Sequence, residues 1–323
     1  MKKNWSGKLD SVNTGSLKTP YSSDESRMRQ FITGFADAEG CFYVRVSKKA
    51  KMKVGWAVEL VFSIRLHIKD LALLEAIAKF FGVGKVYTHE KTQEASYVVN
   101  TVKELGVIIE HFLKYPLRTQ KWSDFMLFKQ VWELFASKKH LTKEGLEQIV
   151  NIKAAMNTGT YLEAFPNTAA VVRPTAPKDL AETPIDPSWM AGFVSGDGCF
   201  SVHLKDSPLS TLGERVWLRL IVTQHSRDKE LLDNFVDFFG CGIVGKDSRV
   251  GKEASYFVVQ KFCDIIEKII PFFDEYPVLG VKSKDYEDFK RCVNYIELKT
   301  HLTLDGLNAI RELAQNMNRS RKV

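Results

Sequence analysis

The chain contains FITGFADAEGCF at residues 31–42 and a second version of this segment, WMAGFVSGDGCF, at residues 189–200. Each segment has an acidic residue directly before Gly-Cys-Phe, and these two residues, Glu39 and Asp197, are 158 residues apart. Related segments recur downstream at spacings of 158 to 161 residues, including EASY at 94–97 and 253–256, and KKHLTKEGL at 138–146 with KTHLTLDGL at 299–307. Similarity over this length indicates a duplicated domain, and a pseudo-twofold axis between two such domains can bring the two acidic residues together.

The composition is that of a globular protein, and 323 residues leave room for two domains. The net charge of +7 and the sequence pI of about 9.0 suit a polyanionic partner. Five cysteines, an odd number with no C-x-x-C pair, argue against a disulfide framework or a zinc site and fit a reducing compartment. The start has no secretory signal and no apolar run approaches the roughly 18 residues of a membrane span, so we expect no membrane partner.

The repeats divide the chain into two domains and a linker, which is rich in Pro, Thr and Ala and therefore typical of an extended connection. The expected parts are an N-terminal tail at 1–27, a first domain at 28–157, a linker at 158–185, a second domain at 186–318 and a C-terminal tail at 319–323. In each domain the hydrophobic pattern predicts the order αββαββα followed by terminal helices. The predicted fold class is α+β, with two pseudo-symmetric domains that each contain an antiparallel sheet.

The first two predicted strands of each copy have one apolar face and one face of side chains that read base edges in a DNA major groove, interleaved with Tyr and Trp. The residues of this second face are Tyr43, Arg45, Ser47, Glu59, Ser63, Arg65, Ser201, His203, Lys205, Arg215, Trp217, Arg219 and Thr223, and Lys85 and Tyr87 join them from the third strand. A solvated face without a ligand gives the same pattern in one strand. Its recurrence in both copies of a basic chain favours contact with nucleic acid.

The helix before each acidic residue carries small residues one turn apart, such as Gly34 and Ala38 in the first copy. Such residues share a helix face and permit close helix contact, so packing of the two helices predicts neighbouring carboxylates. Carboxylates at helix C-termini repel each other and the partial negative charge of the helix ends. A divalent cation removes this conflict, and carboxylate and carbonyl oxygens suit Mg²⁺, which also takes phosphate oxygens.

Among the other acidic residues near the repeats, Asp37 is a weaker candidate for the site and two further aspartates are interpreted as helix caps. Asp37 has Ser195 as its counterpart, so the twofold symmetry does not support a catalytic role for it. Asp70 and Asp228 are placed to cap the helices that follow them.

The segments TGFADAEG and AGFVSGDG resemble the two motifs of a single-chain LAGLIDADG homing endonuclease, with the fungal organellar group I intron type as the closest fit. The resemblance covers about residues 27–318. It implies two αββαββα domains whose sheets form a saddle in the DNA major groove. It further implies a monomeric, site-specific enzyme of the mitochondrial matrix that makes a double-strand break with 3′ overhangs in a long asymmetric DNA target.

The resemblance also implies which residues form the metal site. Glu39 and Asp197 are expected to be catalytic residues and metal ligands, and the carbonyl groups of Ala38 and Gly196 are the adjacent ligands. The implied cofactor is Mg²⁺, with Mn²⁺ as a substitute and with Ca²⁺ bound without cleavage.

Three further polar residues are implied to take part in catalysis. Lys121 and Lys282 match lysines that lie near the cleavage centre and organise water or offset phosphate charge. Gln224 joins the same network late in the second strand. Its counterpart is Leu66, so the two half-sites are expected to differ chemically.

Two alternative functions stay open from the sequence. One is a group I intron RNA maturase on the same scaffold, with intron RNA as the partner, and the other is a sequence-specific DNA-binding regulator. The retained acidic residues favour the nuclease, since RNA binding does not need them.

Overall fold

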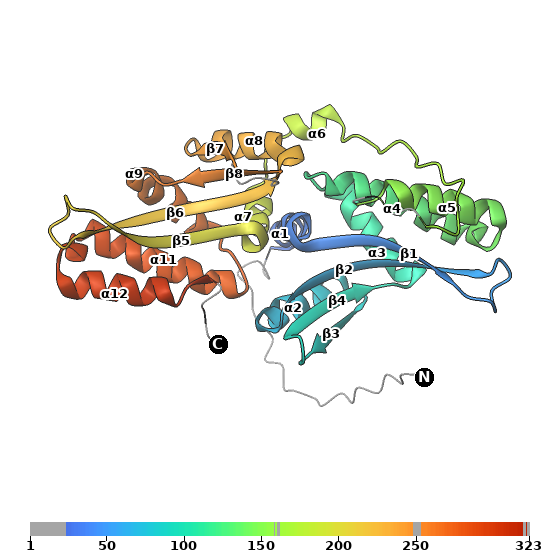
Figure 1. Cartoon of the computed structure of the whole chain (residues 1–323), viewed down its shortest axis with the longest axis horizontal. Helices are drawn as coiled ribbons and strands as arrows, with labels where there is room; N and C mark the ends of the chain where they lie inside the picture. The colour runs from blue at the N-terminus through green and yellow to red at the C-terminus, as the bar shows by residue number, and fades with distance from the viewer. Residues whose placement is uncertain (1–23, 158, 160–161, 248–252, 319–320, 322–323) are drawn as a thin grey trace.

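The structure is a computed structural model that describes residues 24–157, 159, 162–247, 253–318 and 321. Two halves of the same design lie on either side of a central pair of helices, α1 and α7 (Figure 1). Each half contains a four-stranded antiparallel sheet, with strand order β1-β2-β4-β3 in the first and β5-β6-β8-β7 in the second. The predicted α+β fold class is confirmed.

The first half follows the predicted order of elements. They are α1 (Glu25–Glu39), β1 (Gly40–Lys48), β2 (Trp56–His67), the 3₁₀ turn η1 (Ile68–Asp70), α2 (Leu71–Phe81), β3 (Lys85–His89), β4 (Glu94–Val99), α3 (Val102–Lys114), α4 (Lys121–Ala136), η2 (Lys139–Leu141) and α5 (Lys143–Ala155).

The second half repeats this order after a short helix in the linker, α6 (Lys178–Glu182). Its elements are α7 (Pro187–Asp197), β5 (Gly198–Asp206), β6 (Glu214–His225), η3 (Ser226–Asp228), α8 (Lys229–Phe239), β7 (Ile243–Lys246), β8 (Ala254–Val259), α9 (Phe262–Asp264), the π-helical turn η4 (Ile265–Ile269), α10 (Ile270–Glu275), α11 (Val281–Glu297), η5 (Thr300–Leu302) and α12 (Leu304–Gln315).

Each half has its own core between the apolar face of its sheet and its helices. The ring of Phe42 on β1 lies 5.4 Å from that of Phe128 on α4. Phe200 on β5 and Phe289 on α11 repeat this contact at the same distance. The opposite face of each sheet stays uncovered by helices and carries the alternating polar residues, as period-2 alternation requires.

The two halves meet where glycines let α1 and α7 approach each other. A Cβ on Gly34 would lie 1.9 Å from the carbonyl oxygen of Trp189, and one on Gly192 would lie 2.0 Å from that of Phe31. No side chain fits at either position, so the backbones of the two helices are in direct contact. This contact brings the C-terminal ends of both helices, with their acidic residues, to the same place (Figure 1).

The halves differ where the first has one helix, α3, and the second has the series α9, η4 and α10. Pro271 lies within this series, where the first half has Glu110. Proline has no N–H group and cannot complete the α-helical hydrogen-bond pattern, and the wider π-helical turn lies just before it.

The linker is less extended than predicted, because it contains α6 and packs on the first half. Phe165 lies 4.9 Å from Trp56, measured between ring centroids. The N-terminal tail expected at 1–27 lies outside the described residues up to residue 23, and α1 begins at Glu25. Of the C-terminal tail expected at 319–323, only Arg321 is described. No helix in the described part of the chain is long and apolar enough to cross a bilayer.

Candidate active site

The carboxylates of Glu39 and Asp197 lie at the seam between the halves, because α1 ends at Glu39 and α7 ends at Asp197. A Cβ on Gly196 would lie 3.6 Å from Glu39 Oε1, so the Glu39 carboxylate rests against the residue that precedes Asp197. A cavity lined by Glu39, Asp70 and Lys282 opens here. The structure thus brings together the two acidic residues that the repeat identified.

Burial raises the pKa of Glu39, and the nearby charge of Asp197 raises it further, while Lys121 and Lys282 lower it. Burial also raises the pKa of Asp197. Two half-buried carboxylates in repulsion form an anionic site whose ionised state needs a positive charge beside it.

Each candidate lysine binds the end of a motif helix. Lys121 Nζ donates to the carbonyl oxygens of Ala36 and Ala38, both at 3.1 Å. Lys282 Nζ donates to that of Gly196 at 3.1 Å and to that of Gly198. The carbonyls of Ala38 and Gly196, expected as metal ligands, therefore each accept a hydrogen bond from a lysine, and each keeps a second lone pair.

The lysines also act on the charge balance of the site. Burial lowers the pKa of Lys121, whereas Asp37, Asp197 and Glu39 raise it. Together the two ammonium groups supply positive charge beside the carboxylates.

Gln224 makes the two half-sites different. Its Nε2 donates to Asp197 Oδ2 at 2.5 Å, and this bond lowers the pKa of Asp197 against the effect of burial. Leu66 takes the equivalent place beside Glu39 and has no polar group to donate.

Asp37 has a structural role that agrees with its exclusion from the acidic pair. It is buried on α1 and accepts hydrogen bonds from the backbone N–H groups of Arg118 (2.8 Å) and Thr119 (3.1 Å), from Thr119 Oγ1 (2.7 Å) and from Trp189 Nε1 (3.0 Å). Ser195 holds the equivalent loop of the second half with one bond, accepted from the Leu279 N–H at 3.0 Å. Burial raises the pKa of Asp37, and its bonds to Arg118 and Thr119 lower it.

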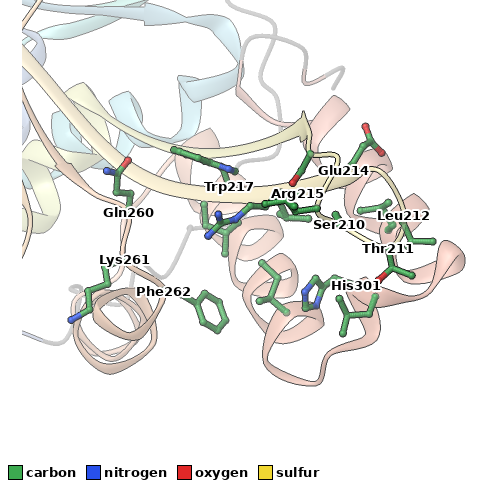
Figure 2. Close-up of a pocket in the computed structure, with 17 residues that line it drawn as sticks. Ser210, Thr211, Leu212, Glu214, Arg215, Trp217, Gln260, Lys261, Phe262 and His301 are labelled. Atoms are coloured by element: carbon green, nitrogen blue, oxygen red, sulfur yellow. The ribbon is translucent and has the colours of Figure 1, made fainter.

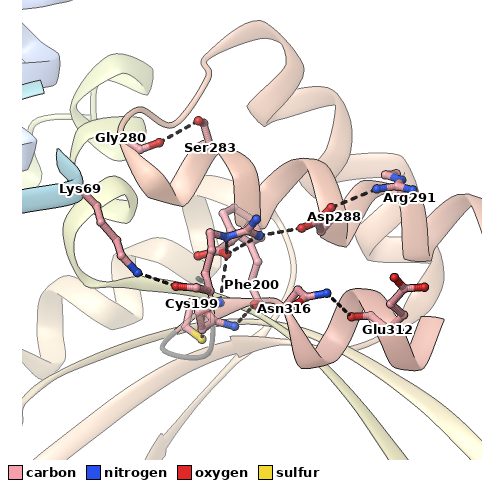
Figure 3. Close-up of polar contacts among 12 residues, drawn as sticks. Lys69, Cys199, Phe200, Gly280, Ser283, Asp288, Arg291, Glu312 and Asn316 are labelled. Atoms are coloured by element: carbon pink, nitrogen blue, oxygen red, sulfur yellow. Dashed lines mark hydrogen bonds and ion pairs between the residues drawn. The ribbon is translucent and has the colours of Figure 1, made fainter. Parts of the chain in front are cut away.

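A second pair of buried acids, Asp124 and Asp285, lies one turn after the lysines and was missed by sequence reasoning. Asp285 Oδ1 accepts from the N–H of Asn318 at 3.0 Å and pairs with Arg321 at 2.8 Å. Asp124 binds Asn157 and Arg173 in the same way. Lys69 of the first half donates to the carbonyl oxygen of Arg321, and Figure 3 shows Lys69 pointing toward this region beside Cys199 and Phe200. The sequence signal was the repeated Met-Asn pair at 156–157 and 317–318, whose asparagines these aspartates bind.

Most residues predicted on the polar sheet face are open to solvent. Tyr43 is 38% exposed and Tyr87 is 42% exposed. The residues classed as exposed are Tyr43, Arg45, Glu59, Arg65, Lys85, Tyr87, His203, Lys205, Arg215 and Thr223, and those of intermediate exposure are Ser47, Ser63, Trp217 and Arg219. Ser201 is the exception, at 5% exposure, because its hydroxyl is 2.6 Å from His203 Nε2. Its contact with DNA stays a prediction.

The polar face of the second sheet is crowded with positive charge. Lys205 and Arg215 face each other across β5 and β6, and both lie over the ring of Trp217, at 4.5 and 5.8 Å from its centroid. Arg219 Nε is buried and has no hydrogen-bond partner among the described residues. Like charges opposed on a sheet repel each other, so this surface is suited to a polyanion.

A separate groove lies at the other end of β6, lined by Glu214, Phe262 and His301 (Figure 2). It is far from the seam, because Asp206 and Glu214 pair at the end of the strands opposite Asp197. It does not belong to the candidate active site.

Among the described residues, no three His, Cys, Asp or Glu side chains are grouped to hold a metal ion.

These features define a class of protein: two α+β domains joined through a duplicated motif helix, with paired carboxylates and lysines at the seam and a basic sheet face beside them. The family model of the LAGLIDADG endonucleases matches residues 32–132 and 190–293. The chain belongs to this family.

Curated relatives carry names that refer to introns. The chain is 38% identical over 282 residues to the "Probable intron-encoded endonuclease 3" of Neurospora crassa, covering 86% of this chain and 52% of that protein. It is 38% identical over 299 residues to "Probable intron-encoded endonuclease 2" of the same fungus, covering 89% and 64%. The chain thus spans about half to two thirds of these relatives.

Solved structures are similar over nearly their whole length. The I-SmaMI LAGLIDADG homing endonuclease bound to cleaved DNA superposes with a TM-score of 0.87 at 41% identity, covering 91% of this chain and 98% of that one. I-LtrWI, a LAGLIDADG homing endonuclease bound to target DNA, gives a TM-score of 0.87 at 39% identity, covering 93% and 100%.

Proposed function

We propose that the chain is a site-specific DNA endonuclease that makes a double-strand break in a long asymmetric target. The observation that carries this proposal is the meeting of Glu39 and Asp197 at a pseudo-twofold seam, with a polar sheet face on either side. The strands of a duplex are themselves related by twofold symmetry, so each half-site would address one backbone. The product would carry 3′ overhangs, as the family resemblance implies.

The donor atoms at the seam fit a divalent cation, and we propose Mg²⁺, with Mn²⁺ as a substitute. Glu39 and Asp197 would hold it through their carboxylates, and Ala38 and Gly196 would contribute backbone carbonyls, since hard oxygen ligands suit this ion. A cation bound there would polarise a phosphoryl oxygen and supply hydroxide at neutral pH. A relative, I-SmaMI, was solved with uncleaved DNA in the presence of calcium ions, which supports our expectation that Ca²⁺ binds here without cleavage.

The side chains around the carboxylates would orient the reaction. Lys121 and Lys282 would offset the negative charge that builds up on the phosphate. Their hydrogen bonds to the ends of the motif helices hold the two ammonium groups in place for this. Gln224 orients the Asp197 carboxylate and keeps it ionised at lower pH than burial alone allows. Cleavage of the two strands would therefore differ in rate and in pH dependence.

The polar sheet faces would bind the DNA target. Exposed Arg and Lys side chains such as Arg65 and Lys205 would contact phosphate or guanine, while Tyr43 and Trp217 would make flat contacts. The chain would act as a monomer, because one chain provides both half-sites, and the domain boundaries would be those at 28–157 and 186–318. We propose a location in the mitochondrial matrix, as the family resemblance implies, and the intron-encoded names of the fungal relatives agree with it.

An intron RNA maturase remains the alternative function, and it predicts faster splicing of the host intron when the protein is added. The half-buried, mutually repelling carboxylates favour the nuclease, because RNA binding would gain nothing from retaining them.

The test is selection of cleaved sites from a randomised duplex library in Mg²⁺, with a parallel incubation in Ca²⁺. We expect one long asymmetric site, cut on both strands in Mg²⁺ and only bound in Ca²⁺. Glu39→Gln and Asp197→Asn should bind the selected site with unchanged affinity and lose at least about a thousandfold in the cleavage rate of one or both strands.

Gln148→Leu is a matched control, because it removes an exposed amide on α5, on the helix side of the first half. It should cut at the wild-type rate. Full cleavage by both carboxylate variants would contradict the site, and absence of any metal-dependent cut would contradict the proposed function.

A further inference from the structure

Two aspartates cross the seam and bind the opposite half. Asp70, at the end of η1 in the first half, accepts a hydrogen bond through Oδ1 from the N–H of Val281 at 2.7 Å. Asp228, at the end of η3 in the second half, accepts one through Oδ1 from the N–H of Gln120 at 2.7 Å. The two contacts are copies of each other under the pseudo-twofold symmetry.

Both acceptors bind at the first turn of a long helix, and in α4 the only other side-chain acceptor described there is Thr119 Oγ1, which accepts from the Lys121 N–H at 3.1 Å. Gln120 precedes α4 and Gly280 precedes α11, and neither makes a capping bond with its side chain. The free N–H groups and the positive end of a helix dipole favour an anion at this position. Each helix therefore receives its capping carboxylate from the other half of the molecule.

The capped turns carry the lysines of the candidate active site. Lys121 is the first residue of α4 and Lys282 is the second residue of α11. Each lysine places its ammonium group on the end of a motif helix, at the carbonyls of Ala38 and Gly196. A shift of either capped turn would move the ammonium group away from the carboxylate that it serves.

The contact between Asp70 and Val281 is built with little tolerance. Gly280 has φ of 71°, and a Cβ there would lie 2.3 Å from Asp70 Oδ1, so Asp70 packs directly against a glycine backbone. Asp228 is 7% exposed. Burial raises the pKa of both aspartates, and the bonds to Val281 and Gln120 oppose this rise.

We infer that Asp70 and Asp228 are positioning residues for the lysine of the opposite half-site: Asp70 sets Lys282 and Asp228 sets Lys121. Removing either aspartate slows cleavage of one DNA strand. The affected strand is the one served by the lysine of the opposite half. This inference rests on the proposed function and goes beyond it, because it links cleavage of each strand to a residue across the seam.

The test uses the full chain and a duplex site labelled differently on its two strands. The strand that Lys282→Met slows is identified first, and Asp70→Ala should slow the same strand by between about tenfold and a hundredfold. Asp228→Ala should slow the strand that Lys121→Met slows, by a similar factor. Asp233→Ala on α8 is the matched control, because its carboxylate pairs only with Lys229 on the surface, and both strands should keep the wild-type rate.

Double variants make the assignment sharper. Asp70→Ala combined with Lys282→Met should be no slower than Lys282→Met alone, while Asp70→Ala with Lys121→Met should show both losses. Asp70→Asn keeps an oxygen that can accept the bond, so it should stay within about threefold of wild type. An equal effect of Asp70→Ala on both strands, or an Asn variant as slow as the Ala variant, would overturn the inference.

Failure of the proposed function gives a different result, because a wild-type protein that cuts no site in Mg²⁺ fails before any variant is compared. If an Ala variant does not fold, Asp70→Glu and Asp228→Glu replace it. They keep the charge, displace the oxygen by one methylene and carry the same strand-bias prediction. If the lysine variants slow one strand each but the aspartate variants slow neither strand selectively, the inference is overturned while the proposed function stands.

Discussion

Asp37 of α1 accepts a hydrogen bond of 3.0 Å from the indole N–H of Trp189 on α7, directly across the contact between the two halves. The second copy of the motif has no equivalent bond, because Ser195 replaces the aspartate. One carboxylate thus ties the first motif helix both to its own lysine-bearing loop and to the second motif helix.

Asp37→Ala should lower the free energy of unfolding by at least about 2 kcal/mol, because it leaves several buried donors without an acceptor. Chemical denaturation of the metal-free protein measures this loss. The exposed Asp233→Ala should stay within about 0.5 kcal/mol of wild type. Equal stability of the two variants would mean that the Asp37 network does not hold the halves together.

Gly34→Ala and Gly192→Ala should each destabilise the protein by about 1–3 kcal/mol or more, because the new methyl groups meet backbone carbonyls at 1.9 and 2.0 Å. Gly106→Ala is the control, since it lies within α3 with its nearest neighbour at 3.5 Å. This change should be stabilising by roughly 0.5–1 kcal/mol. Wild-type stability of both seam variants would contradict the close helix contact.

The stability of the metal-free protein should fall as pH rises from the ordinary range of carboxylic acids. Burial raises the pKa values of Glu39 and Asp197 above their ordinary values of 4.5 and 3.8, so the folded state holds these protons to higher pH than the unfolded state does. Their contribution is fully present below the ordinary pKa values and is lost as pH passes through the raised ones.

Mg²⁺ or Ca²⁺ should restore this stability at pH values above the raised pKa values and have little effect below the ordinary ones, because protonated carboxylates do not hold the ion. Thermal unfolding in EDTA and in each cation across the pH range measures both effects. Burial also raises the pKa values of Asp37, Asp70 and Asp228, so these residues change the stability in the same direction. Subtracting the pH profile of Glu39→Gln from that of wild type isolates the contribution of Glu39. A cation effect on the melting temperature that is unchanged in this variant would place the ion elsewhere.

Gln224→Leu gives the second half-site the residue found in the first. Loss of the bond to Asp197 removes an effect that lowers its pKa, so the acid side of the pH–rate profile should move to higher pH for one strand only. Strand-specific cleavage rates from pH 5 to 8 measure the shift, and Gln148→Leu on the exposed surface of α5 should show none. A shift of both strands together would contradict the asymmetry of the half-sites.

Lys205→Ala should weaken DNA binding and reduce the slope of log affinity against log salt by about 1, as expected for one lost phosphate contact. Lys143→Ala on α5 removes an equal charge from the surface on the helix side and should leave the slope unchanged. Titrations at several salt concentrations compare them. Identical slopes for the two variants would mean that the charged cluster around Trp217 does not contact phosphate.

The repeat was sufficient to predict the fold and the proximity of the two carboxylates. The sequence signals for both lie within short segments, and most of them occur in both copies. Strand alternation, the acid-Gly-Cys-Phe segments and the small residues of the motif helices can all be read within a few residues. The helix at 71–81 was predicted with the bounds that the structure has.

Contacts across the seam could not be predicted in this way. Asp70 was expected to cap α2, but it makes no capping bond there, because its side chain turns to Val281 of the other half. Its sequence neighbours give no sign of this, since the bond depends on how two domains pack. The helix α6 was missed for a related reason, as a five-residue helix in a Pro-rich segment has no amphipathic period to detect.

The direct contact of α1 and α7 within one chain has a consequence for how this protein can change over generations. In a homodimer every replacement appears twice, so both sides of a recognised site must stay palindromic. Here Gln224 and Asp37 each stand against a different residue in the other copy, and such single replacements are inherited independently. Under the proposed function, either sheet can drift toward a new half-sequence while the glycine-packed axis keeps the cutting geometry fixed.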